Sequence, residues 1–241
     1  MSTSEHLVQG VRLTMPVQIR HASAAVAMYS VPVARAQSMI DYSGLQVLQW
    51  RPGRAICGLL FVDYVDGDLG QYREFGVSFM VRPPGGGAGR FADQRSLLRG
   101  KAGVFIHRLP VDQPFTLEAG RSIWGFPKVM STIDLSAAGP RAALHIDGQL
   151  VADLSVSSGL PVPGAGVAAS LDAYTHLDGV TRRVPWRMTA SRTRTRPGGA
   201  SVELGDHPWA RELAELGLPR RALMSSTIGS LQMSFGDAEP A

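Results

Sequence analysis

Short apolar or alternating runs, separated by turn residues, dominate this sequence and constrain its fold more than any other feature. Asp147-Gly148 and Asp178-Gly179 each lie between two such runs, which is typical of tight β-hairpins. Strands are predicted over residues 22–36 (one strand or a pair), 55–65, 72–82, 103–109, 115–120, 187–196 and 227–235, and short helices over 34–42 and 207–217. The pattern predicts a mainly β (α+β) fold, an antiparallel, curled, barrel-like or cone-like sheet with a few short helices.

The 241 residues leave room for one large domain or two small ones. No internal repeat or clear linker divides the chain, so we predict a single domain over residues 1–241. The glycine- and proline-rich segment 82–90 is predicted to be a loop between strands, either a lid or a plain surface loop.

Composition excludes several classes of protein. A net charge of +4 is too weak to indicate nucleic-acid binding. The single cysteine, Cys57, excludes an internal disulfide framework. No apolar run is long enough to cross a membrane. Residues 22–36 resemble a signal peptide, but Glu5 precedes them and Pro32 interrupts the apolar part, so we predict a cytoplasmic protein.

The two faces of the predicted strand 72–82 differ in character. Side chains alternate between the faces of a strand. One face is nearly all apolar: Arg73, Phe75, Val77, Phe79 and Val81. The other has a polar end and small residues in its middle: Tyr72, Glu74, Gly76, Ser78 and Met80. The second face suits the wall of a cavity, and a solvent-exposed face is the alternative.

Lys128 is one of only two lysines in the chain and lies in the segment "GRSIWGFPKVM". Burying an ammonium among apolar side chains is costly, and lysine, unlike arginine, can release its proton. If residues 124–128 form a strand, Trp124, Phe126 and Lys128 share a face, and Pro127 requires the end or edge of the sheet there. The setting favours a neutral, reactive amine. The alternative is a lysine whose stem packs while its charge reaches water.

These residues carry a resemblance. The segment "AGRSIWGFPKVM" resembles the lysine segment of the acetoacetate decarboxylase family, and "GQYREFGV" resembles its Tyr-x-Glu strand. The C-terminal stretch from Asp206 to Gly236 is similar to the helix and final strands of that family, and the resemblance runs from about Ala34 to Phe235. It implies an acetoacetate decarboxylase-like fold, a small-molecule oxo acid or ketone as substrate, a homo-oligomer, and neither a cofactor nor a metal.

The resemblance also implies roles for individual residues. Lys128 is expected to be the Schiff-base nucleophile and Glu74 the acid/base of the pocket. The expected substrate-binding residues are Tyr72, Met80, Trp124, Phe126 and Arg121, with Arg121 holding the lysine segment or a nearby carboxylate. The iminium then acts as an electron sink, so that carbon dioxide can leave or a carbon–carbon bond can form or break beside it.

The sequence departs from the pattern of true decarboxylases at three places. Val129 stands where they carry a second lysine, and Ser23 lies near the position of their pocket arginine, with Arg20 and His21 close by. Leu59 or Leu60 stands where they have a second glutamate, and Asp63 is the nearest acid. We therefore predict a Schiff-base lyase of the aldolase or dehydratase type. The alternatives are a decarboxylase of acetoacetate or another β-keto acid, and a non-catalytic ligand-binding member of the fold.

The remaining candidates are weaker. Five histidines show no metal-ligand spacing and are predicted to be structural or surface residues: His21, His107, His145, His176 and His207. Arg192, Arg194 and Arg196 are predicted to share one strand face. That face either attracts phosphates or an acidic carrier protein, or is simply solvated.

Overall fold

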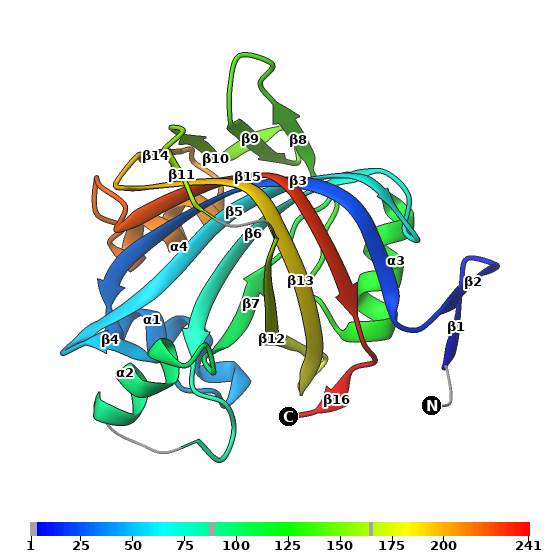
Figure 1. The fold of residues 1–241 in the computed structure, drawn as a ribbon, viewed down its shortest axis with the longest axis horizontal. Coiled ribbons are helices and arrows are strands. Elements are labelled where there is room, and N and C mark those ends of the chain that lie inside the picture. Colours follow the sequence, from blue (N-terminus) through cyan, green and yellow to red (C-terminus); the bar gives the residue numbers. More distant parts are fainter. Residues whose placement is uncertain (1–3, 87–89, 164–165) are drawn as a thin grey trace.

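Seven strands form a closed barrel (Figure 1). The computed structural model describes residues 4–86, 90–163 and 166–241. The barrel order is β13 (Val180–Pro197), β12 (Val167–Leu177), β7 (Gly103–Arg108), β6 (Tyr72–Val81), β5 (Arg54–Gly67), β3 (Val17–Pro32) and β15 (Met224–Phe235), and pairing of β15 with β13 closes the ring. All neighbours are antiparallel except β12 and β7. The predicted mainly β, barrel-like fold is confirmed.

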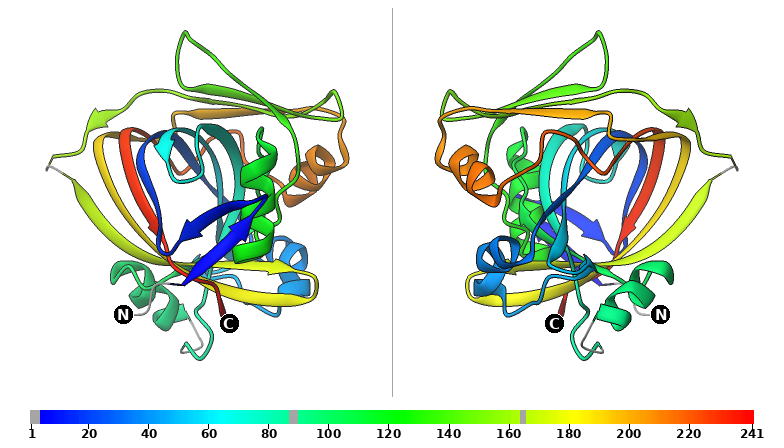
Figure 2. Two further views of the ribbon diagram at one scale, coloured as in Figure 1. Left: turned by 90° about the vertical axis from the view of Figure 1, so that its right-hand side faces the viewer. Right: turned by 90° about the vertical axis from the view of Figure 1, so that its left-hand side faces the viewer.

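The barrel strands are long and curved, as the two side views of Figure 2 show. Register shifts interrupt the pairing of β3 with β5 and of β3 with β15, and such irregularities bend strands. The stretch 22–36 is the end of β3 followed by the start of a helix. Short strands extend the sheet: β4 (Gln49–Arg51), β11 (Leu160–Pro161) and β16 (Glu239–Pro240).

A second sheet of four strands packs on the outside of the barrel (Figure 1). Its strands are β8 (Thr132–Leu135), β9 (Arg141–Ile146), β10 (Gln149–Val156) and β14 (Ala200–Leu204). The apolar face of β6 packs against this sheet, since Phe75, Val77 and Phe79 belong to the same buried cluster as Leu144 and Leu154. A separate hairpin, β1 (Glu5–Val8) and β2 (Val11–Thr14), precedes the barrel. Both predicted hairpin turns, at 147–148 and 178–179, are confirmed.

Two of the helices match the predictions. They are α1 (Val33–Ile40), continued by the short 3-10 turn Asp41–Ser43, and α4 (Pro208–Leu216), which ends at Gly217 with φ 75°. The predicted strand over 115–120 is wrong, because that segment lies inside α3 (Pro114–Trp124). Pro114 stands in the first turn of α3, where its missing N–H costs nothing.

Helix α2 (Arg90–Leu98) was not predicted. It begins at the end of the predicted loop 82–90, of which residues 87–89 lie outside the described part of the chain. Asp93, only 1% exposed, accepts hydrogen bonds from Arg82 and the backbone of Gln49, which ties α2 to the sheet. None of the helices in the described ranges is long and apolar enough to cross a membrane.

Candidate active site

The interior of the barrel holds a cavity of about 270 Å³. Its wall is largely apolar, and the polar groups gather where β5 and β6 approach the segment after α3. Tyr72, Glu74, Gly76, Ser78 and Met80, which form one face of β6, all line the cavity. The prediction that this face forms a cavity wall is therefore confirmed. Strict alternation along β6 explains it, since the intervening residues pack outward against the second sheet.

Lys128 is buried at the polar end, with 3% of its surface exposed. Its Nζ atom lies 3.0 Å from Oε2 of Glu74 and donates a hydrogen bond of 3.0 Å to Oγ1 of Thr116. Nζ also lies 5.1 Å from the centre of the Tyr72 ring, within the range of a cation–π contact. The alternative of a lysine that reaches water is wrong for this structure.

The turn after α3 places Lys128. The predicted strand over 124–128 is wrong: α3 ends at Trp124, and Gly125 adopts a left-handed conformation with φ 66°. The chain then reverses, and the backbone N–H of Phe126 donates to the Gly120 carbonyl. This turn brings Lys128 back along α3, so that its stem packs against Gly120. A Cβ at Gly120 would lie 2.5 Å from Cδ of Lys128, so the contact requires glycine.

Glu74 is held on both oxygens. Tyr64 donates a hydrogen bond of 2.9 Å to Oε1, while Oε2 faces Lys128. The rings of Tyr64 and Tyr72 stack with their centres 4.0 Å apart. Burial, together with the nearby Glu74, raises the pKa of both tyrosines well above the usual value. Both phenols therefore stay protonated at neutral pH, and Tyr64 remains a hydrogen-bond donor.

The other predicted site residues separate into two groups. Trp124, Phe126 and Met80 line the cavity with Lys128. Arg121 does not line it; its guanidinium donates a 3.2 Å hydrogen bond to the carbonyl of Lys128. Arg121 thus holds the lysine segment, which is one of the two roles expected for it, and it is not placed to bind a substrate in this cavity.

The residues at the positions of departure do not supply charge to the cavity. Arg20 pairs with Asp66 and Asp68 on the barrel exterior. Asp63 lies 3.7 Å from Arg73, also outside the cavity. Leu60 lines the cavity wall. Lys128 is the one cationic side chain among the described residues that line the cavity.

Two polar residues of the site were missed from the sequence. Tyr64 belongs to the predicted strand 55–65, and alternation with Leu60 and Val62 places it on the cavity face. The sequence carried that signal. No sequence pattern indicated Thr116, because its segment is predicted to be a strand and not part of α3.

The remaining candidates lie elsewhere. Arg192, Arg194 and Arg196 are all exposed on β13, and the first two donate to the carbonyls of Gly229 and Gly159. Within the described ranges, no group of three or more His, Cys, Asp or Glu residues is arranged to hold a metal ion.

The site can exchange a proton between an amine and a carboxylate in apolar surroundings. Both groups are nearly inaccessible to bulk water, and Thr116 and Tyr64 orient them. A carbonyl carbon that reaches Nζ would also be close to Glu74. Such an arrangement suits nucleophilic attack followed by proton transfer at the neighbouring carbon.

A family model and several solved structures match this chain. The family model described as acetoacetate decarboxylase matches residues 8–238. A search of curated proteins gave no match. Acetoacetate decarboxylase from Legionella pneumophila is a structural neighbour, with a TM-score of 0.63 and 16% identity over 94% of this chain and 87% of that one.

Two further structures share the fold. The enduracididine biosynthesis enzyme MppR, complexed with pyruvate, has a TM-score of 0.58 and 18% identity over 95% of this chain and 91% of that one. An acetoacetate decarboxylase-like enzyme from Sphingomonas wittichii RW1 has a TM-score of 0.55 and 15% identity over 94% of this chain and 93% of that one. At such identities the likeness shows a common fold.

Proposed function

The chain belongs to the acetoacetate decarboxylase family, and we propose that it is a Schiff-base-forming lyase of the aldolase or dehydratase type. The observation that carries the proposal is the buried pair of Lys128 and Glu74 at the polar end of an otherwise apolar cavity. A buried amine beside a carboxylate supplies both groups that imine and enamine chemistry needs.

The first stage forms the iminium. Transfer of a proton from Nζ of Lys128 to Glu74, 3.0 Å away, gives a neutral amine and a carboxylic acid. The amine attacks the carbonyl carbon of the substrate. The carbonyl oxygen leaves as water, taking one proton from the amine and one from Glu74. The products are the iminium and the Glu74 carboxylate.

The second stage uses the iminium as an electron sink. Glu74 takes a proton from the carbon next to the iminium, which gives an enamine. A hydroxyl on the following carbon can then leave as water with the Glu74 proton. Alternatively, the enamine can attack the carbonyl carbon of a second compound, whose oxygen takes the Glu74 proton, and the iminium forms again. Water finally hydrolyses the iminium and frees Lys128. Tyr64 keeps Glu74 oriented through both proton transfers.

Two observations favour this chemistry over decarboxylation. No second cation lines the cavity among the described residues, so nothing there would hold a β-carboxylate beside the iminium. A structure of MppR contains the condensation product of pyruvate and imidazole 4-carboxaldehyde, an example of a carbonyl condensation product bound within this fold.

Two alternatives have support of their own. Structures of acetoacetate decarboxylase are among the neighbours, which supports decarboxylation of a β-keto acid. The largely apolar cavity would also serve a non-catalytic ligand-binding protein. We further propose a homo-oligomer, as the family resemblance implies, and a cytoplasmic location, as predicted from the sequence. Light scattering on the purified chain tests the assembly, because it gives the mass in solution.

The deciding experiment compares two reactions of the purified protein. Carbon dioxide release from acetoacetate measures decarboxylation, and deuterium uptake next to the carbonyl of pyruvate and butanone measures enamine formation. We expect exchange into at least one of the two compounds, with little carbon dioxide release. Lys128→Met should abolish the exchange, and the matched control Lys101→Met should not, since Lys101 is exposed. Fast carbon dioxide release without exchange would establish the decarboxylase alternative, and neither reaction would favour the ligand-binding one.

A further inference from the structure

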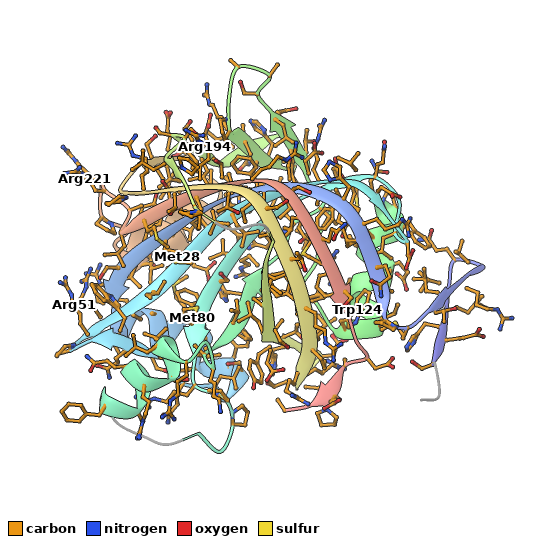
Figure 3. The ribbon with its side chains drawn as sticks, viewed as in Figure 1. Met28, Arg51, Met80, Trp124, Arg194 and Arg221 are labelled. Carbon is orange, nitrogen blue, oxygen red and sulfur yellow. The ribbon has the colours of Figure 1, made fainter. Side chains whose placement is uncertain are left out.

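The cavity extends far beyond the space that a small oxo acid needs. Its wall on β6 runs from Glu74 to Met80, a separation of six positions or about 20 Å along the strand. Met80, Met28 and Ile56 line the end away from the polar groups. In Figure 3, Met28 and Met80 lie together at the opposite end of the barrel from Trp124, which lines the cavity near Lys128.

Two glycines line the middle of the cavity. Gly58 on β5 and Gly76 on β6 both line it and place no side chain in it. A Cβ at Gly58 would come within 2.7 Å of Oγ of Ser78, and one at Gly76 within 3.0 Å of Cγ of Leu60. The side chains of Ser78 and Leu60 therefore pack over these glycines. The passage from the polar end to the methionines stays free of large side chains from these two positions.

The charges in the cavity disfavour a substrate that carries a carboxylate. Lys128 is already paired with Glu74, and the rest of the described lining offers no cation. A carboxylate in the apolar part would lose its hydration and find no cation, only the neutral hydroxyl of Ser78, and one at the polar end would meet Glu74. Methionine side chains, in contrast, adapt to varied apolar shapes.

We propose that the substrate is a neutral ketone with an extended hydrocarbon chain. Its carbonyl carbon faces Nζ of Lys128, and its chain runs past Gly58 and Gly76 to Met28 and Met80. The proposal rests on the proposed Schiff-base function for the position of the carbonyl, and on the apolar cavity alone for the chain. The proposal narrows the predicted substrates, oxo acids and ketones, to uncharged ketones.

The test uses straight-chain methyl ketones from butanone to nonanone and one charged analogue of octanone, with a carboxylate in place of its terminal methyl group. Binding is followed by tryptophan fluorescence, because Trp124 and Trp186 line the cavity. Imine formation is followed in parallel by borohydride trapping. We expect the dissociation constant to fall about fourfold for each added methylene until the cavity is full, the value for burying one methylene from water. The charged analogue should bind at least tenfold more weakly than octanone.

Variants at the far end of the cavity test where the hydrocarbon chain of the ketone lies. Met80→Phe and Met28→Phe should each lower the preference for nonanone over butanone at least tenfold. The exposed Met130, which does not line the cavity, provides the control Met130→Phe with an unchanged preference. A dissociation constant that is flat or rises with chain length, or equal binding of the charged analogue, would overturn the proposal. Length-dependent binding with no trapped adduct for any ketone would leave this proposal standing and refute the Schiff-base function instead.

Discussion

The Nζ atom of Lys128 lies 3.0 Å from Oε2 of Glu74, inside a barrel where both side chains are more than nine-tenths buried. The two residues come from different elements, Glu74 from β6 and Lys128 from the turn after α3. The pair therefore depends on the packing of α3 against the barrel, and on the contacts that hold each group from its other side. Thr116 on α3 holds the amine, and Tyr64 on β5 holds the carboxylate.

Glu74→Gln should slow turnover by about 10²–10⁴-fold, the usual contribution of a positioned acid or base. Adduct formation at Lys128 should suffer less, because solvent protons can replace those that Glu74 exchanges in forming the iminium, whereas no other carboxylate among the described lining residues can remove the proton from the neighbouring carbon. Comparing the rate of deuterium exchange with the yield of the borohydride adduct measures the difference. Glu118→Gln, at an exposed position on α3, is the matched control. If exchange and adduct yield fell together, Glu74 would be a structural residue.

Gly120→Ala should impair the site while leaving the fold intact. The new methyl would lie 2.5 Å from Cδ and 2.6 Å from Cε of Lys128, so the lysine stem must move and carry Nζ away from Glu74. A displacement of about 1 Å can lower a rate by about 10²-fold. Alanine also favours a helix over glycine by up to about 1 kcal/mol, so the melting temperature should change little. Gly139→Ala, where a Cβ would meet no atom within 4 Å, should alter neither rate nor stability.

A decrease in both the reaction rate and the melting temperature of Gly120→Ala would contradict this account. It would mean that the clash is relieved by moving α3 instead of the lysine side chain.

At alkaline pH the protein should unfold, and its buried tyrosines should ionise in the same transition. Burial raises the pKa of Tyr29 to about 12 and raises the pKa of Tyr64, Tyr72 and Tyr174 as well. Unfolded tyrosines lose their protons near pH 10. The native state therefore binds more protons above about pH 10, so the stabilisation is complete below that pH and is lost as the pH rises towards about 12. Tyrosinate absorbance and circular dichroism, recorded in one titration, should change together. Ionisation of the four buried phenols near pH 10 with the sheet intact would refute the prediction.

The strand-rich fold and half of the site could be predicted from the sequence, because alternation is a local signal. The period of two along 72–82 separated the two faces of β6 and left cavity wall or solvent as alternatives for the face with Glu74, whose role the family resemblance supplied. The two Asp-Gly turns fixed both hairpins, because each supplies the left-handed residues that a tight turn needs.

The rest depends on interactions that are distant in the sequence. The segment 115–120 has apolar residues that fit a strand as well as a helix, and only its packing beside Lys128 decides for α3. The strand expected over 124–128 is wrong for the same reason: a glycine before Phe126 and Pro127 fits the end of a strand as well as the turn after a helix. The pairing of Thr116 with Lys128 follows from that helix and turn, so no local pattern revealed it.

Borohydride reduction in the presence of a ketone panel, followed by peptide mapping, tests the central claim most directly. The chain holds only two lysines, so the result is unambiguous. The account predicts that the reduced ligand mass appears on the peptide that contains Lys128, and that Lys128→Met abolishes it. An adduct on Lys101, or no adduct with any ketone or oxo acid of the panel, would contradict it.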